Sequence, residues 1–191
     1  MTESLARLAG EFRKLPAVGQ KSAMRYAYRV MDMNDAEAEA FVTAIVGARK
    51  SVRRCKLCGD FCEAETCERC NTADQSVICV VKDPRDIATI ERMSYGGLFH
   101  VLGGTLDYQK GVKVEGLRID ALLDRLSGVK EVIIATGTDI GGEMTAAYLS
   151  SVIKPHGVRV SRIACGVPIG SDLEGVDEYT LKRAIDERKT L

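Results

Sequence analysis

The first thirty residues alternate apolar and polar positions with the period of an α-helix. Apolar side chains recur every three or four positions from Leu5 to Leu15, which predicts a first helix that stops at Pro16. The sequence Pro-Ala-Val-Gly at positions 16–19 predicts a tight turn, and a second helix is predicted over residues 20–31. The chain therefore opens with two helices joined by a short hairpin.

A third helix is predicted directly after Asn34. Asn34 followed by Glu37 has the pattern in which the two residues cap each other's backbone N–H at a helix N-terminus. One face of this helix carries Ala38, Phe41, Val42, Ile45 and Val46. Helices confined to the first fifty residues are too few to bury much surface on their own.

From residue 76 onwards, short apolar runs alternate with helical periods. The runs predict strands at residues 76–81, 98–104, 131–136 and 157–164. Asp83 and Pro84 are typical of a helix start. Further helices are predicted over residues 117–126 and 143–153. This alternation predicts a mainly parallel sheet that is covered on both faces.

Five of the seven cysteines lie within sixteen residues. Cys55 and Cys58 form one pair with a two-residue spacer, and Cys67 and Cys70 form a second pair eight residues later. Such a spacer lets both sulfurs of a pair face one ion, and Gly59 can supply the positive φ that the turn often needs. Four thiolates leave no open position on Zn2+, so the pattern predicts a structural zinc site.

Cys62 is a fifth candidate ligand within this stretch. An iron–sulfur cluster on Cys55, Cys58 and Cys62 is one alternative, although bacterial cluster motifs have other spacings. A spare thiol beside the metal is the other interpretation of Cys62. Cys79 lies in a predicted strand and Cys165 in the sequence "IACGVP", and both are interpreted as small core residues.

The composition is that of a folded protein, because 46% of the 191 residues are apolar and 28% are charged. The length suits one large domain or two to three small ones. The sequence contains no apolar run of membrane-spanning length and no signal-peptide pattern, which predicts a cytoplasmic location. In that reducing compartment, clustered cysteines bind metal more often than they form disulfides.

The net charge of zero hides an asymmetry along the chain. Residues 1–56 hold 11 basic and 6 acidic side chains, whereas residues 57–191 hold 16 basic and 21 acidic ones. The N-terminal part is therefore the one suited to a polyanion.

Five of these basic residues surround the predicted hairpin. Lys21, Arg25 and Arg29 lie four positions apart and share one face of the second helix, while Arg13 and Lys14 precede the turn. The start of that helix also offers unpaired backbone N–H groups to a phosphate. The arrangement favours a helix-hairpin-helix that binds the DNA backbone, and a solvated helix face is the alternative.

The motifs and their order resemble one family. "LPAVGQKSAMR", the two CxxC pairs, "VICVVKDPRDIATIE", "FHVLGG", "EVIIAT" and "GVPIGSDLE" are together similar to RecR, the bacterial recombination mediators. The resemblance extends from about Leu5 to the C-terminus. It implies an α/β fold with a helix-hairpin-helix bundle at residues 1–54, a four-cysteine zinc finger at 55–70, a mainly parallel Toprim domain at 76–172 and a C-terminal segment with a short helix at 173–191.

The resemblance also implies a function and its residues. RecR proteins form ring-like homotetramers that clamp DNA without sequence preference. They act with RecO, and in many bacteria with RecF, to load RecA at gaps coated by single-strand-binding protein, which implies association with the nucleoid. The residues carried over are Cys55, Cys58, Cys67 and Cys70 for one zinc ion per chain, Lys21 and Arg25 for DNA, and Glu143 for a partner.

Several positions depart from the family pattern. Ala17 stands where the hairpin usually has its first glycine, which narrows the backbone conformations available there. Lys82 stands where Toprim enzymes carry a glutamate, and Gly141 replaces another glutamate. The loop at residues 107–114 also has a different sequence. Contacts made by these loops are expected to differ from those of the family.

Two functions from different classes remain, namely a DNA clamp without catalysis and a Mg2+-dependent Toprim enzyme acting on phosphodiesters. Mg2+ needs carboxylate ligands, and the ammonium of Lys82 would repel it. Asp139 and Glu143 are the remaining candidates for a weak ion site. The sequence has no complete phosphate loop for an ATPase. His100 and His156 lack a paired nucleophile and are interpreted as structural.

The C-terminal residues carry a narrow apolar stripe at Leu181, Ala184 and Ile185. A stripe of this size cannot form a core alone, so the segment is expected to pack on its own Toprim domain or on that of a neighbouring subunit. A frayed tail is the alternative.

Overall fold

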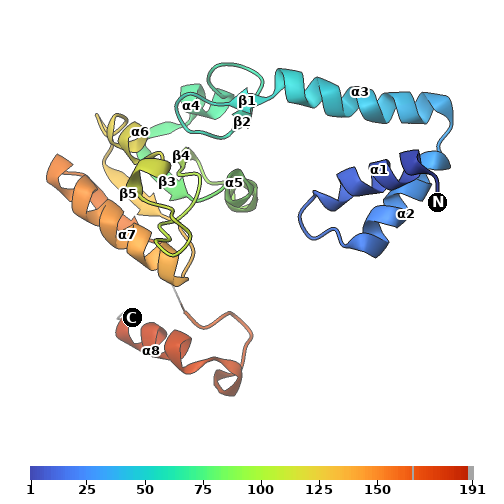
Figure 1. The fold of residues 1–191 in the computed structure, drawn as a ribbon. Coiled ribbons are helices and arrows are strands. Elements are labelled where there is room, and N and C mark those ends of the chain that lie inside the picture. Colours follow the sequence, from blue (N-terminus) through green and yellow to red (C-terminus); the bar gives the residue numbers. More distant parts are fainter. Residues whose placement is uncertain (165, 189–191) are drawn as a thin grey trace. The chain divides into compact units, whose positions relative to one another are not determined.

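The computed structural model describes residues 1–164 and 166–188. Cys165, one of the two cysteines interpreted as core residues, lies outside the described residues. The chain divides into two compact units, of which the first spans Met1–Val52 and the second begins at Arg53 (Figure 1). In the part of the chain that is described, no helix is both long enough and apolar enough to cross a bilayer.

The first unit is helical. Its elements are α1 (Glu3–Arg13), α2 (Gln20–Met31) and α3 (Asp35–Ser51). α1 and α2 pack through small side chains, because Ala9, Ala23 and Ala27 form the buried centre of their contact. α1 ends slightly earlier than predicted and leaves Leu15 exposed, since the N–H of Leu15 bonds to the carbonyl of Phe12 three residues back and tightens the last turn.

The hairpin between α1 and α2 places Ala17 in the left-handed region, with a φ of 61°. The N–H of Val18 donates to the carbonyl of Leu15 at 3.2 Å and closes the turn. A left-handed conformation costs a residue with a Cβ about 1–2 kcal/mol. The alanine therefore keeps the hairpin conformation that glycine adopts without this cost.

α3 begins as predicted. The Asn34 side chain accepts from the N–H of Glu37 at 2.9 Å, and the Glu37 carboxylate accepts from the N–H of Asn34 at 3.3 Å, which confirms the capping pattern. The apolar face of α3 is largely exposed in the first unit: 58% of Val42 and 52% of Ile45 are accessible to solvent. We call this surface, Phe41, Val42, Ile45 and Val46, the α3 face.

The second unit contains a four-stranded parallel sheet, as predicted. Its strands are β3 (Asp74–Val81), β4 (Gly97–Val101), β5 (Glu131–Ile134) and β6 (Arg159–Arg162), in the order β4-β3-β5-β6. The helices are α5 (Pro84–Glu91), α6 (Ile119–Leu123), α7 (Ile140–Ile153) and α8 (Glu178–Asp186), with short 3-10 turns at Val114–Gly116, Lys154–His156 and Leu173–Gly175.

Both faces of the sheet are covered. Alternate residues of β3 enter two separate cores, with Ile78 on one side and Cys79 on the other. α6 and α7 contribute to the core that contains Ile78, whereas Ile87 of α5 contributes to the core that contains Cys79. Cys79 is 3% exposed, so its interpretation as a core residue is confirmed.

Two helix predictions in the second unit also differ from the structure. The helix predicted over residues 117–126 is reduced to α6, because the N–H groups of Arg125 and Leu126 bond to carbonyls three residues back and end the α-helical pattern. α7 begins three residues earlier than predicted, because the Asp139 side chain accepts from the N–H of Gly142 at 2.7 Å and caps the helix.

Candidate metal centre and nucleic-acid interface

The four cysteines predicted as ligands converge on one point. Their sulfur atoms all lie within 4.8 Å of one another, with 3.9 Å between Cys55 and Cys70 and 3.5 Å between Cys58 and Cys67. A tetrahedral ion with bonds of about 2.3 Å to sulfur would place the sulfurs roughly 3.8 Å apart. The cluster therefore has the dimensions of a site for one metal ion.

Short local elements bring the two pairs together. β1 (Arg53–Arg54) pairs with β2 (Phe61–Cys62), and α4 (Glu68–Thr72) carries the last ligand. Gly59 adopts the expected positive φ, 80°, and its N–H donates to the carbonyl of Cys55 at 3.0 Å. The turn after the first pair is thus set by glycine, as predicted.

The pKa values of two of the four thiols are shifted in opposite directions. Burial acts to raise the pKa of Cys55, but hydrogen bonds from the backbone of Cys58 and Cys67 outweigh it and lower the pKa to about 6. A hydrogen bond with Cys70, together with burial, raises the pKa of Cys58 above its usual range. Four thiolates in this space would repel one another, and a metal cation held among them would stabilise the ionised form.

Cys62 lies outside this group of four. Its sulfur donates to the carbonyl of Ala64 at 3.0 Å, and its side chain is half-buried. The four-sulfur group contains Cys67 and Cys70 in its place, which is evidence against the iron–sulfur alternative on Cys55, Cys58 and Cys62.

The first cysteine pair is docked on the edge of the sheet. The N–H of Val101 at the end of β4 donates to the carbonyl of Cys58 at 2.7 Å. The guanidinium of Arg118 donates to the carbonyls of Lys56 and Leu57 at 3.1 and 3.3 Å. The metal-binding loop therefore covers the edge strand β4, whose backbone groups would otherwise lack partners.

A buried histidine organises this contact. His100 is fully buried, and its Nδ1 accepts from Arg125, which also donates to the carbonyl of Phe99 at 2.9 Å. Nε2–H of His100 consequently donates to the carbonyl of Arg118 at 2.8 Å. Burial lowers the pKa of His100 to about 3, so the imidazole is neutral. This agrees with the structural role predicted for His100.

Arg69, between the two cysteines of the second pair, fixes the other side of the loop. It donates to the carbonyls of Tyr95 and Gly97 at 2.9 and 3.3 Å and pairs with Glu91 of α5 at 2.7 Å. Its guanidinium also stacks over the ring of Phe99 at 5.1 Å. Sequence reasoning missed this arginine, although its position inside a CxxC motif was visible.

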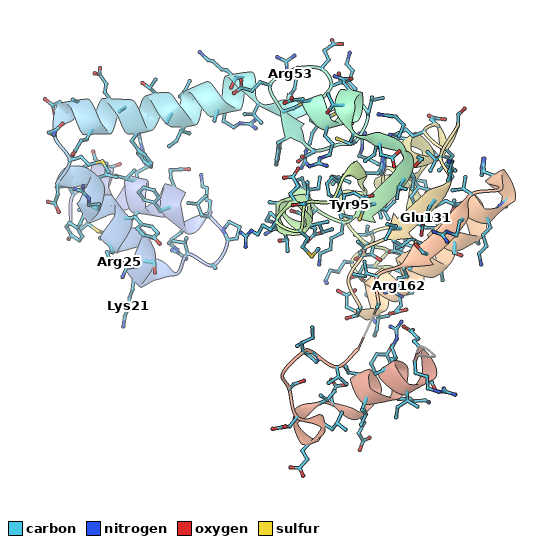
Figure 2. The ribbon with its side chains drawn as sticks, turned by 180° about the vertical axis from the view of Figure 1, so that it is seen from behind. Lys21, Arg25, Arg53, Tyr95, Glu131 and Arg162 are labelled. Carbon is cyan, nitrogen blue, oxygen red and sulfur yellow. The ribbon has the colours of Figure 1, made fainter. Side chains whose placement is uncertain are left out.

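The predicted DNA-binding residues lie on the surface of the first unit. Lys21, Arg25 and Arg29 are exposed on α2, and Figure 2 shows Lys21 and Arg25 projecting from it. Gly19 gives α2 no side-chain cap, so the first N–H groups of the helix are open to a ligand. Lys14 is paired with Glu11 at 2.7 Å.

Arg13 is exposed at the last position of α1. The hairpin therefore brings predicted cations from both helices to the surface of one small unit.

The carboxylates predicted as a weak ion site have other partners. Glu143 forms ion pairs with Arg162 of β6 and with Arg183 of α8, and the first of these, more than the second, lowers the pKa of Glu143. Arg162 also donates to the carbonyl of Gly137 at 3.0 Å. Asp139 caps α7.

At the end of β3, Lys82 is half-buried. The next residue, Asp83, accepts from the N–H of Arg85 at 2.9 Å and caps α5, as predicted. Asp83 and Asp139 therefore act as helix caps, and Glu143 forms ion pairs with arginines.

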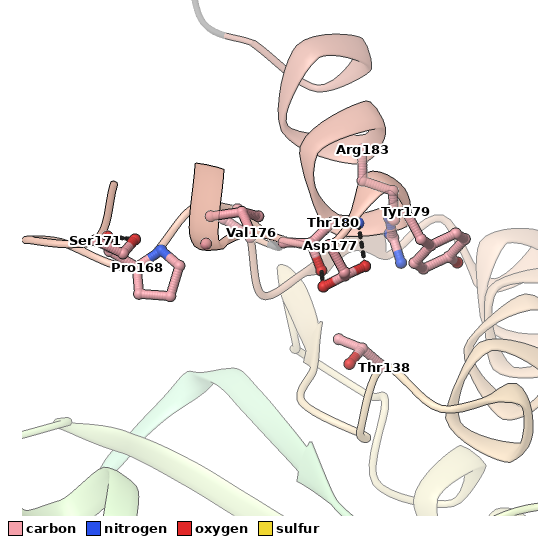
Figure 3. A pocket seen from close by; sticks show the side chains of 11 residues that line it. Thr138, Pro168, Ser171, Val176, Asp177, Tyr179, Thr180 and Arg183 are labelled. Atoms are coloured by element: carbon pink, nitrogen blue, oxygen red, sulfur yellow. Dashed lines mark hydrogen bonds between the residues drawn. The ribbon is translucent and has the colours of Figure 1, made fainter. Parts of the chain in front are cut away.

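The C-terminal segment lines a cavity with the loop before α7. The cavity has a volume of about 520 Å3, and Arg183, Thr138 and Tyr179 face it (Figure 3). α8 is capped by Asp177, whose side chain accepts from the N–H of Thr180 at 2.9 Å. Arg183 of α8 pairs with Glu143 of α7, whereas Ile185 of the apolar stripe is exposed, so the packing expected of this stripe stays a prediction.

Comparison with known proteins identifies similar sequences across the chain. Family profiles match residues 5–49 ("RecR, helix-hairpin-helix"), 76–164 ("Toprim domain") and 166–189 ("RecR, C-terminal"). Two proteins named "Recombination protein RecR", from Clostridium perfringens strains ATCC 13124 and 13, are each 42% identical over 192 residues. The aligned region covers 98% of this chain and 97% of each relative.

Proposed function

Because the chain belongs to the RecR family and is thus a recombination mediator in DNA repair, we propose that it acts as a clamp on DNA and not as an enzyme. One observation supports this most strongly: exposed cations surround an uncapped helix start in the first unit, whereas the Toprim carboxylates are already paired within the chain. Exposed cations and free N–H groups can bind phosphates, whereas carboxylates that are already paired with arginines are poor ligands for Mg2+.

The helix-hairpin-helix is the proposed DNA-binding surface. A phosphate at the start of α2 would accept hydrogen bonds from its free N–H groups and be neutralised by Lys21 and Arg25. Arg29 and Arg13 would reach neighbouring phosphates. Lys14 would exchange its exposed pair with Glu11 for a phosphate at little cost, because such surface pairs contribute little stability. Contacts of this kind do not distinguish base sequences.

The proposal that the chain lacks catalysis rests on the end of β3 and the start of α7. A Toprim enzyme needs several carboxylates around Mg2+, but Lys82 carries a positive charge there and Asp83 caps α5. Glu143 is neutralised by Arg162 and Arg183. A metal would have to displace these arginines before it could bind.

We assign one structural zinc ion per chain to the cysteine cluster. The spacing of Cys55, Cys58, Cys67 and Cys70 fits a tetrahedron of sulfur ligands, and four protein ligands leave no position for a substrate. Zinc would fix the loop that Arg69 and Arg118 dock on the sheet. The proposed role of the ion is therefore structural and not catalytic.

We propose that the protein assembles into a homotetramer and that the α3 face, with its exposed Phe41, Val42, Ile45 and Val46, is one subunit contact. Each subunit alone would make only a few phosphate contacts. Linking four subunits raises the effective concentration of each contact once the first has formed, so a ring binds DNA much more tightly than its parts.

The partners proposed are those that the family resemblance implies. RecO, and in some bacteria RecF, would bind the clamp and promote RecA loading at gaps covered by single-strand-binding protein, in the cytoplasm at the nucleoid. Glu143 would contribute to a partner surface through Arg183, because its carboxylate holds α8 beside the cavity of Figure 3.

Binding and nicking assays on one plasmid preparation test the clamp. We expect the full-length protein to retain gapped plasmid in a gel-shift assay, to lose it as salt is raised, and to show no preference among sequences. Adding RecO and single-strand-binding protein should increase retention at the gap. Incubation with Mg2+ should leave supercoiled plasmid intact. Mg2+-dependent nicking or resealing would contradict the clamp and favour the enzyme alternative.

A charge placed on the α3 face is expected to break the assembly. Ile45→Glu buries a carboxylate in the proposed contact, so light scattering should show monomers or dimers of the 20.8 kDa chain instead of tetramers. Ala40→Glu adds the same charge on the opposite side of α3 and should leave the tetramer intact. Tetramers in both variants would exclude the α3 face as a subunit contact.

A further inference from the structure

Cys62 stands next to the metal ligands without being one of them. β1 and β2 pair Arg53 with Cys62, and Cys55 follows Arg53 by two positions. Residues two apart on a strand point to the same face, so Cys55 and Cys62 are diagonal neighbours on one face of this hairpin. Cys62 packs against the buried cluster of Cys55, Cys58 and Cys70, which agrees with this placement.

The two sulfurs differ in accessibility. Cys55 is fully buried, whereas Cys62 is half-buried on the outer side of the cluster. The Cys62 thiol also donates to the carbonyl of Ala64 at 3.0 Å, a hydrogen bond that a serine hydroxyl can make as well. Cys62 is thus more accessible to a small oxidant than Cys55 is.

We propose that Cys62 is an oxidation site that disconnects Cys55 from the metal by forming a Cys55–Cys62 disulfide. The inference rests on the proposed metal site, and the oxidant is hydrogen peroxide. A sulfur pair at this position would act as a reversible redox switch on the loop that docks on β4, since thiol reductants restore both thiols.

The reaction balances with one peroxide. Hydrogen peroxide transfers an oxygen atom to the Cys62 thiol, which becomes a sulfenic acid, and releases one water. The Cys55 thiolate then attacks the Cys62 sulfur, the S–S bond forms, the S–O bond breaks, and the hydroxide that leaves takes a proton from solvent to give a second water. The two sulfurs together lose two electrons, and the peroxide gains them.

The geometry allows this bond after a small movement. Diagonal neighbours in an antiparallel pair have Cα atoms roughly 7–8 Å apart, slightly beyond the usual span of a disulfide. β1 and β2 are only two residues long, so the hairpin can shift as the Cys55 sulfur leaves the ion to attack Cys62. Three ligands would remain, Cys58, Cys67 and Cys70, and affinity for the metal would fall.

The test uses the full-length metal-loaded protein. Metal content is measured first, so that failure of the metal site is distinguished from failure of the switch. Peroxide is then added with a chromogenic chelator, and disulfides are mapped by mass spectrometry of peptides. We expect metal release to be at least about fivefold faster in the wild type than in Cys62→Ser, with a Cys55–Cys62 disulfide in the wild type.

Two further variants and the disulfide map of the wild type serve as controls. Cys79→Ala removes a buried thiol outside the cluster and should release metal at the wild-type rate, and Cys62→Ala provides a second replacement if serine lowers the initial metal content. The wild-type disulfide map tests the proposal independently of any variant. Equal release rates in wild type and Cys62→Ser, or disulfides confined to the four ligands, would overturn it.

Discussion

Replacing Cys58 with alanine is expected to abolish metal binding and to destabilise the second unit by more than about 4 kcal/mol, the range typical of losing a structural metal. Cys58 combines two functions, because its sulfur belongs to the cluster and its carbonyl accepts from Val101 at the sheet edge. A loop released from the metal would lose this bond together with the docking contacts of Arg69 and Arg118.

Metal analysis and urea unfolding followed by circular dichroism measure this effect. Cys79→Ala is the matched control, since it removes a buried thiol outside the cluster and should retain the metal at a cost near 1 kcal/mol. Chelation of the wild-type protein should reproduce the destabilisation of Cys58→Ala. If Cys58→Ala unfolds at the wild-type urea concentration, the ion has no structural role.

The elements of this fold could be predicted where a local signal specifies them. α3 starts where Asn34 and Glu37 cap each other, and α5 starts where Asp83 precedes a proline. The cysteine cluster was predictable from spacing, because two CxxC pairs have few other arrangements around one ion. In each case the residues that determine the structure are close together in the sequence.

The contacts that dock the metal loop could not be predicted in this way. Arg118 reaches the carbonyl of Lys56 across 62 positions, and Arg69 reaches that of Tyr95 across 26. A salt bridge can be guessed from an acidic and a basic residue, but an arginine that donates to a backbone carbonyl can have any residue as its partner. The sequence therefore does not indicate which residue that partner is. Only the folded sheet shows which arginines meet which carbonyls.

The ion pairs between distant side chains could also not be predicted from the sequence. Glu143 was interpreted as a partner contact or a weak ion ligand, yet it pairs with Arg162 and Arg183. Arg162 ends β6 and meets the start of α7 because parallel strands share one carboxyl edge, whereas Arg183 comes from α8, 40 positions after Glu143. The position of Ala17 was recognised as unusual, and its left-handed φ was then found.

The double replacement of Lys21 and Arg25 with alanine is expected to reduce DNA affinity by roughly 100-fold or more near 0.1 M salt. Each lysine or arginine that neutralises a phosphate contributes about one unit to the slope of log affinity against log salt. Two such cations are removed from every engaged subunit of the clamp, so the slope itself should fall. Both side chains are exposed, and stability should change by less than about 0.5 kcal/mol.

Fluorescence anisotropy with labelled gapped DNA, repeated over a range of salt concentrations, separates this effect from misfolding. Arg7→Gln removes an exposed cation from α1 outside the hairpin and is the matched control, so its affinity should stay within a few-fold of the wild type. An equal loss of DNA affinity in the double variant and in Arg7→Gln would indicate that the overall positive charge of the unit, and not the hairpin, determines binding. If the double variant binds with the wild-type affinity and salt slope, the DNA contact must lie on another surface, since non-specific binding is dominated by the cations that displace counterions from the phosphates.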